Sequence, residues 1–449
     1  MAASPAPLKN RLYELWGTVT DVAPGVIKIA GVSELAGVGN EIRIEKPGLS
    51  AFGEILRVSA DSVTALLFSP CEAIRIGDNV QIEPEARVEP GDHWLGQVVD
   101  FRGQIAGEGV TRPKLNATSR PLQAAPLPAH ARRQLGARMA SGWRVTDTLL
   151  PICQGQRMGL FAGSGIGKST FLGSLAAGLE ADRVVIALIG ERSREVNDFI
   201  KSKLPESVLP RTVVVTATSS EPPGAKKRAA YCAMAAAEHF RDQGHQVLLL
   251  VDSITRFAEA HRETALMAGE TPALNAFPPS TVRVIAELCE RAGPGTDGTG
   301  DITAIYSVLV AGSDMEEPVA DMIRGILDGH MILSREIAER GRYPAVDVLR
   351  SISRSLPSAA SREENVLLGE YRRLVALYEE VAPMLRANLY EMGKDPDTDR
   401  AIALAGALDS FVSQPSPDGV EAAFADLQQI LAPPAEAQTD TPPVKTRKG

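Results

Sequence analysis

The sequence contains few cysteines and few aromatic residues. Only four of its 449 residues are cysteine, no two of them form a CxxC pair, and the six histidines show no metal-ligand spacing with them. A disulfide framework and a zinc site are therefore not expected, and a reducing compartment such as the cytoplasm fits this usage.

The sequence also lacks a basic excess and long hydrophobic runs. Lysine and arginine number 47 against 56 aspartates and glutamates, whereas nucleic-acid binders usually carry a basic excess. The longest apolar runs, 184–189 and 247–251, are far too short to span a bilayer. The first residues lack the apolar segment of a secretory signal, so no such signal is expected. With 44% hydrophobic residues, we expect a globular protein of two to four domains.

Composition changes along the chain predict three domains and a tail. Residues 1–85 contain short β-type runs separated by turns, which is typical of a small β-barrel. Residues 86–360 alternate continuous apolar runs with helical stretches, which indicates a parallel α/β sheet covered on both faces. Residues 361–432 lack strand signals and contain the spacing of a long amphipathic helix, which indicates a helical domain, and residues 433–449 have the composition of a disordered tail.

A glycine-rich motif follows the apolar run at 158–161 and precedes a helical pattern. This strand–loop–helix context is what a phosphate-binding loop requires, because glycines let successive N–H groups face phosphate oxygens at a helix N-terminus. The first position of the usual GxxxxGK[ST] pattern is Ala162 instead of glycine. The residues expected to bind ATP are Gly163, Ser164, Gly165, Ile166, Gly167, Lys168, Ser169 and Thr170, with Ser169 also on magnesium.

Two acidic positions complete the expected nucleotide site. Asp252 ends the apolar run at 247–251, where a carboxylate for magnesium usually stands. Glu191 and Arg192 follow the run at 184–189, and hydrolysis needs a group that orients the attacking water. Taken alone, Asp252 could simply cap the next helix, and the Glu191–Arg192 pair could be a surface salt bridge.

Seven sequence blocks in order carry a family resemblance that covers roughly residues 13–430. The set resembles the catalytic subunits of rotary ATP synthases, and within that superfamily it most closely resembles the flagellar protein-export ATPases. The ATPases of type III secretion injectisomes are the near relatives of that branch. The blocks are FAGSGIGKST at 161–170, GERSREV at 190–196, EPPGA at 221–225, LLLVDSITRFA at 248–258, ILDGH at 326–330, RYPAVDVL at 342–349 and SISR at 351–354.

The resemblance implies a role for each matching residue. Glu191 matches the general base that polarises the attacking water, and Asp252 matches the magnesium-associated aspartate. Lys168, Arg192 and Arg256 match cations near the γ-phosphate, Tyr343 matches the aromatic that stacks on adenine, and Arg354 matches the arginine finger supplied by a neighbouring subunit. Without the resemblance, Arg354 would be taken for a surface arginine and Tyr343 for a half-buried loop aromatic.

The implied function is magnesium-dependent ATP hydrolysis by a homohexameric ring that energises export of flagellar proteins. The implied fold is a RecA-like core with an N-terminal β-barrel and a C-terminal helical domain. The implied partners are an export regulator, a central stalk, the export gate and substrate–chaperone complexes, with peripheral contact at the cytoplasmic face of the inner membrane.

Three alternatives stay open. The first is an injectisome ATPase, which has the same chemistry and other client proteins. The second is a RecA-like nucleic-acid motor, against which the acidic barrel argues. The third is a non-hydrolysing ring subunit, against which Glu191 argues. One further segment, the basic run Lys226–Arg228, is expected to be a solvated helix end or a ring contact.

Overall fold

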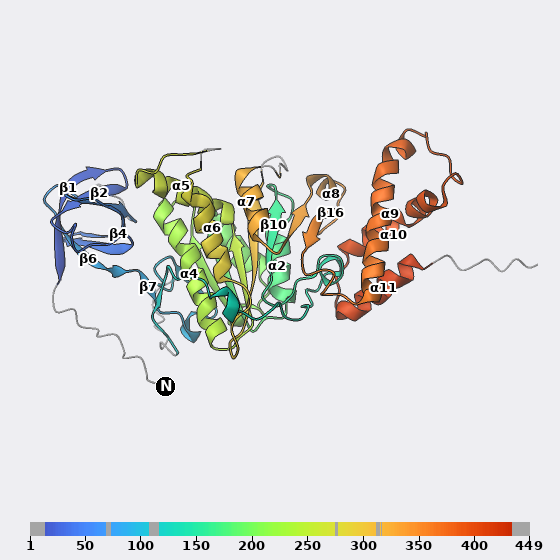
Figure 1. Cartoon of the computed structure of the whole chain (residues 1–449), viewed down its shortest axis with the longest axis horizontal. Coiled ribbons are helices and arrows are strands. Elements are labelled where there is room, and N and C mark those ends of the chain that lie inside the picture. Colours follow the sequence, from blue (N-terminus) through green and yellow to red (C-terminus); the bar gives the residue numbers. More distant parts are fainter. Residues whose placement is uncertain are drawn as a thin grey trace, which may run out of the picture.

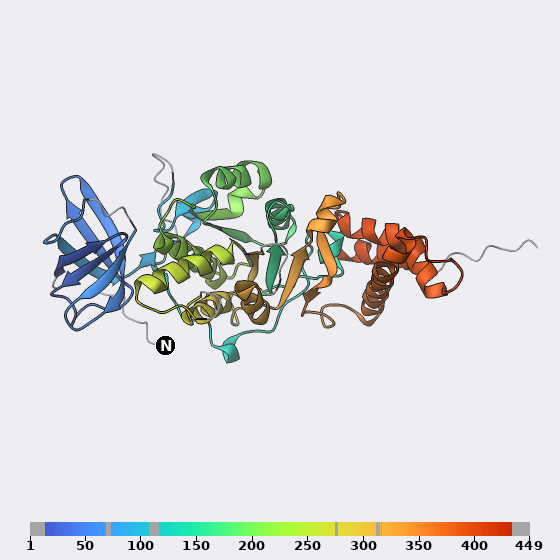
Figure 2. The same ribbon diagram turned by 90° about the horizontal axis from the view of Figure 1, so that it is seen from above.

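The computed structural model describes residues 14–68, 73–106, 116–273, 277–310, 315 and 317–432. The expected tail at 433–449 lies outside these residues. A small β-barrel, an α/β core and a group of C-terminal helices follow one another along the longest axis of the molecule (Figures 1 and 2). In the described part of the chain, no helix is both long and apolar enough to cross a membrane.

The barrel is closed by six antiparallel strands in the order β1-β2-β5-β4-β3-β6. Alternate side chains such as Ile27, Ile29, Ile42 and Ile44 point into its own hydrophobic core, as the period of two in a strand requires. The barrel expected from the sequence is confirmed. Its strands are β1 (Leu15–Ala23), β2 (Val26–Ala30), β3 (Asn40–Lys46), β4 (Leu49–Val58), β5 (Val63–Leu67) and β6 (Asn79–Glu85).

The core contains an eight-stranded sheet in the order β16-β15-β10-β14-β13-β11-β12-β8. All neighbouring strands are parallel except β15 and β16. The sequence predicted the five central strands, and the three at the two edges were not predicted. The strands are β8 (Gln97–Asp100), β10 (Arg157–Ala162), β11 (Arg183–Ile189), β12 (Thr212–Ala217), β13 (Val247–Asp252), β14 (Ile302–Leu309), β15 (Gly329–Leu333) and β16 (Val346–Ser353), beside a short ribbon of β7 (Arg87–Val88) and β9 (Arg120–Pro121).

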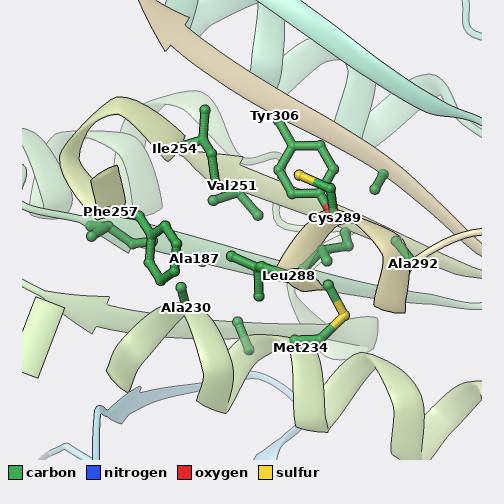
Figure 3. Packing of buried hydrophobic residues seen from close by; sticks show 14 of the residues in the cluster. Ala187, Ala230, Met234, Val251, Ile254, Phe257, Leu288, Cys289, Ala292 and Tyr306 are labelled. Carbon is green, nitrogen blue, oxygen red and sulfur yellow. The ribbon is translucent and has the colours of Figure 1, made fainter. Parts of the chain in front are cut away.

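Helices cover both faces of this sheet, which explains why its strands are continuously apolar. In β11, Val185 and Ala187 pack toward α4 (Pro223–Asp242), α5 (Ile254–Met267) and α6 (Ser280–Arg291), whereas Val184 and Ile186 pack toward the opposite face. Figure 3 shows part of the first cluster, where side chains of α4, α5 and α6 meet those of the sheet. The other described helices of the core are α1 (Arg144–Asp147), α2 (Lys168–Gly178), α3 (Ser193–Asp198), α7 (Pro318–Ile326) and α8 (Arg335–Glu339).

The C-terminal helices are α9 (Arg362–Arg386), α10 (Pro396–Ser413) and α11 (Gly419–Leu431). A capping box fixes the start of α9, because the Ser361 side chain accepts from the backbone N–H of Glu364 and the Glu364 carboxylate accepts from that of Ser361. These helices share one hydrophobic cluster with α2 and the second face of the sheet. The C-terminal helices and the nucleotide-binding core are therefore packed on common side chains.

The basic run Lys226–Arg228 is not a solvated helix end. Arg228 is buried, forms an ion pair with Glu41 of the barrel and lies over the ring of Phe68. Lys227 lies near Glu54, and burial lowers the pKa of Lys227 and raises that of Glu54. Of the two expectations for this run, the solvated helix end was wrong, because a single sequence could not show that the barrel packs on this end of α4.

Gly224, in the first turn of α4, allows this close contact. A Cβ at position 224 would come within 2.5 Å of the side chains of Leu66 and Phe68. We expect Gly224→Ala to lower the free energy of unfolding by about 1–3 kcal/mol, because the barrel must shift to make room. Denaturant unfolding measures this. Gly369→Ala is the matched control, since a Cβ at 369 meets open space and helical alanine is expected to be neutral or stabilising.

Candidate active site

The phosphate loop, residues 162–167, connects β10 directly to α2. Gly165 and Gly167 have positive φ angles of 78° and 88°, a conformation that glycine adopts at little cost. A Cβ at Gly165 would meet open space, so the loop leaves its backbone accessible at the start of α2. This geometry fits the phosphates of a nucleotide, because the first N–H groups of a helix are unpaired within it and attract anions.

Lys168 and Asp252 meet at the carboxyl end of the sheet. The Lys168 Nζ contacts the Asp252 carboxylate and lies 3.9 Å from Glu191 Oε1. The Asp252 Oδ1 also accepts a hydrogen bond of 2.6 Å from Ser307 Oγ. The sequence reasoning missed Ser307, which gave little signal because the same strand also contains the hydroxyl residues Thr303 and Tyr306.

The order of strands explains why these residues converge. β10, β14, β13 and β11 are neighbours in the sheet, and their carboxyl ends therefore lie side by side. Ser169, Glu191 and Asp252 line one cavity at this edge, together with Glu195 and Phe199. The cavity brings together the hydroxyl and the carboxylate expected on magnesium and the glutamate expected to act on water. Hydroxyl and carboxylate oxygens are suitable ligands for a hard cation.

Glu191 is largely removed from water. Burial and the negative charge of Asp252 raise the pKa of Glu191 to about 7, and the nearby Lys168 opposes that rise. A carboxylate with a raised pKa is a stronger base than a free one, and its protonation equilibrium lies near neutral pH. Its environment thus suits a group that accepts a proton from water.

The two arginines expected at the γ-phosphate are placed differently. The Arg192 side chain is 81% exposed and forms an ion pair with Glu195, at 3.7 Å, on the outside of α3. The methylene groups of Arg256 pack over Gly190, next to Glu191, and its guanidinium pairs with Glu259 at 2.9 Å. The structure therefore brings the stem of Arg256 to the site, and it leaves Arg192 at the surface.

The ring of Tyr343, in the loop between α8 and β16, lies against Gly167 of the phosphate loop. Its ring carbons Cδ1 and Cε1 are 3.3 Å from the position that a Cβ on Gly167 would take, and the residue is 50% exposed. An exposed aromatic face beside the loop is available for stacking. Arg335, which the sequence reasoning also missed, donates a 3.2 Å hydrogen bond from Nη2 to the Ser164 carbonyl.

The phosphate loop lies at the carboxyl ends of the parallel strands, and Arg354 lies at their opposite, amino ends. β10 pairs Ala162 with Leu333, whereas Gly329, at the other end of β15, pairs with Ser353. Four residues of strand, about 13 Å, separate the two ends. Arg354 is exposed and donates to the Arg324 carbonyl, so it is not part of its own site.

Comparison with known proteins identifies the class to which this site belongs. Residues 142–353 match the nucleotide-binding domain of the ATP synthase alpha/beta family. Residues 360–431 match the C-terminal domain of the EscN ATPase of type III secretion systems. The fold and the site are those of a P-loop ATPase of the ATP synthase alpha/beta type.

Full-length relatives narrow the class. The chain is 40% identical to the flagellum-specific ATP synthase of Caulobacter vibrioides, over 93% of this chain and 96% of that protein. It is 41% identical to the type 3 secretion system ATPase of Xanthomonas euvesicatoria, over 89% and 90%. The structure of the assembled ATPase EscN from enteropathogenic E. coli superposes with a TM-score of 0.86 at 36% identity, and the match covers 93% of this chain and 100% of the chain in that structure. The chain belongs to the family of flagellar and type III secretion ATPases, and it is an ATPase.

Proposed function

We propose that this protein is the ATPase of a flagellar export apparatus, a homohexamer that hydrolyses ATP with magnesium and so energises protein export. The observation that carries the catalytic part is the convergence of Lys168, Asp252 and Glu191 beside the phosphate loop. Similarity to flagellum-specific ATP synthases supports the flagellar part.

In the proposed mechanism, the N–H groups of residues 163–170 and the Lys168 ammonium hold the β- and γ-phosphates of ATP. Glu191 accepts a proton from the water that attacks the γ-phosphorus in line, while the bond from that phosphorus to the β–γ bridging oxygen breaks and ADP leaves. Cations stabilise the charge that spreads over the equatorial oxygens, and positioning supplies most of the remaining acceleration. Arg256 and Arg192 supply part of the stabilising positive charge once their side chains turn from their glutamate partners, and Tyr343 stacks on the adenine.

Magnesium would be held by Ser169 and Asp252, whose side chains line the same cavity. When bound, the ion neutralises charge on the β- and γ-phosphate oxygens. The contacts of Asp252 with Lys168 and Ser307 support this role, because they hold its carboxylate beside the phosphate loop. We expect chelation of magnesium to abolish hydrolysis.

We also propose how the chain divides into domains and which partners it binds. We propose a barrel domain at 1–85, an ATPase domain at 86–360 and a helical domain at 361–432, supported by the end of β6 at Glu85 and the start of α9 at Arg362. EscN has been described in complex with its central stalk EscO, and we propose a stalk contact here as well. The export regulator, the export gate and substrate–chaperone complexes are the other proposed partners, at the cytoplasmic face of the inner membrane.

An injectisome ATPase is the second candidate, favoured by the match to the EscN C-terminal domain. Deletion of the gene distinguishes the two. Loss of flagellin export and motility is the expected result. Motile cells that no longer secrete effector proteins would assign the chain to an injectisome.

Arg335 supplies a further test of the phosphate loop. Its side chain holds the Ser164 carbonyl, so we expect Arg335→Ala to raise the KM for ATP by about three- to tenfold, as the loss of one solvent-exposed hydrogen bond of about 0.5–1.5 kcal/mol allows. Arg340→Ala, a nearby exposed arginine just past α8, is the control. Steady-state kinetics measure both variants, and equal KM values for the two would contradict this role of Arg335.

A further inference from the structure

The loop that carries Tyr343 is held by the residue before it. The Arg342 side chain is only 10% exposed, whereas the neighbouring Tyr343 ring is open to solvent on one side. The Arg342 Nη2 donates a 2.8 Å hydrogen bond to the carbonyl of Val346, the first residue of β16, where the loop that carries Tyr343 ends. Arg342 therefore closes the loop around Tyr343.

The same guanidinium reaches the C-terminal helices. Its Nε lies 3.2 Å from Oδ1 of Asp409, which is on α10. α8 and β16, which flank the loop, lie on the side of the core that faces α9 and α10 (Figure 1). One side chain thus connects the Tyr343 loop to a helix more than sixty residues away in the sequence.

The helix that carries Asp409, α10, is held in place by hydrophobic packing and by a hydrogen bond from α9. Leu408 and Phe411, on either side of Asp409, belong to the hydrophobic cluster that also contains Ile166 of the phosphate loop and Phe171 of α2. Tyr371 of α9 also donates a 3.3 Å hydrogen bond to the Leu408 carbonyl. Asp409 therefore lies on a helix that packs into the same hydrophobic cluster as the phosphate loop, although its own side chain is 65% exposed.

We propose that Arg342 is a positioning residue for the base side of the nucleotide site, and that Asp409 holds it there. The ion pair keeps the Tyr343 ring next to Gly167, so the stacking face is formed before the nucleotide arrives. A preformed wall lowers the ordering cost of binding and improves affinity without changing the chemical step. This inference rests on the proposed role of Tyr343 in stacking on adenine.

The test is the KM–kcat split of Asp409→Asn, which keeps the size of the side chain and removes its charge. We expect the KM for ATP to rise about two- to fivefold with kcat unchanged, as the loss of a partly exposed ion pair allows. The affinity for inorganic tripolyphosphate should not change, because it has no base to stack. Asp397→Asn is the matched control: Asp397 is on α10, is 62% exposed and pairs with Arg373 of α9 instead of the Tyr343 loop.

Charge exchange gives a second readout. Asp409→Arg alone should raise the KM further, because it places two cations together, and combination with Arg342→Glu should lower it again. This recovery would show that the two side chains act on the KM through their mutual contact, and it should be partial because a glutamate at 342 cannot donate to the Val346 carbonyl. Equal effects of Asp409→Asn on ATP and tripolyphosphate, or no effect on either, would overturn the proposal.

Tyr343→Ala separates this inference from the function on which it rests. If Tyr343→Ala raises the KM for ATP and Asp409→Asn does not, the positioning role of Arg342 fails and the stacking role of Tyr343 stands. If Tyr343→Ala leaves the KM unchanged, the stacking assignment fails and the positioning role fails with it.

Discussion

Glu191→Gln is expected to reduce ATP hydrolysis by about 10²–10⁴-fold, the usual contribution of a general base, while ATP still binds. The amide keeps the shape of the side chain but cannot accept the proton from water. Glu191 lies 3.9 Å from the Lys168 Nζ and lines the cavity beside Asp252, where it can reach a water molecule next to the phosphates. Phosphate release at saturating ATP, together with nucleotide binding by fluorescence, measures the two effects separately.

Glu195→Gln is the control for this experiment, because Glu195 lines the same cavity and pairs with the exposed Arg192. We expect its turnover to stay within a few-fold of the unmodified protein. If Glu191→Gln retained full turnover, Glu191 would not be the base. An unmodified protein that binds ATP without turnover would instead indicate a non-hydrolysing ring subunit.

Arg354→Ala is expected to lower the rate by about 10³–10⁵-fold, the range found for arginine fingers. Arg354 lies at the amino ends of the parallel strands, and its own phosphate loop lies at their carboxyl ends. A catalytic role therefore requires that Arg354 act on a neighbouring subunit. The specific activity of the unmodified protein should then rise with protein concentration as rings form.

The exposed Arg350, four residues earlier on β16, is the matched control for Arg354. Arg350→Ala should retain most of the activity. A specific activity that is independent of concentration down to the monomer would contradict a shared site, and so would full activity of Arg354→Ala.

The central fold was predictable because local sequence determines it. The strands at 184–189 and 247–251 are apolar on both faces, and six short runs with turns between them indicate a barrel. The edge strands were harder to predict: β8 has four residues, and β16 mixes Asp347, Arg350 and serines with its apolar residues. Pairing with a neighbouring strand makes these segments strands, and pairing is not visible in a local pattern.

In the site, too, features set by local sequence were predictable and contacts between distant segments were not. The phosphate loop and Asp252 follow from a motif and a strand end, which are both local features. The buried position of Arg228, the hydrogen bond from Ser307 and the ion pair of Arg342 with Asp409 depend on segments far apart in the sequence. Single-sequence reasoning has no access to such contacts, so it left the run at 226–228 as either a solvated helix end or a ring contact and did not predict its packing on the barrel.

A mixing experiment tests the shared site most directly. Glu191→Gln and Arg354→Ala are each expected to be inactive, but a mixed ring contains interfaces where an intact Glu191 meets an intact Arg354 of the neighbouring subunit. About one interface in four is intact when equal amounts mix at random. We predict that ATP hydrolysis returns on mixing, well above the sum of the two variants. Activity that stays at that sum, in rings shown to contain both variants, would contradict the account.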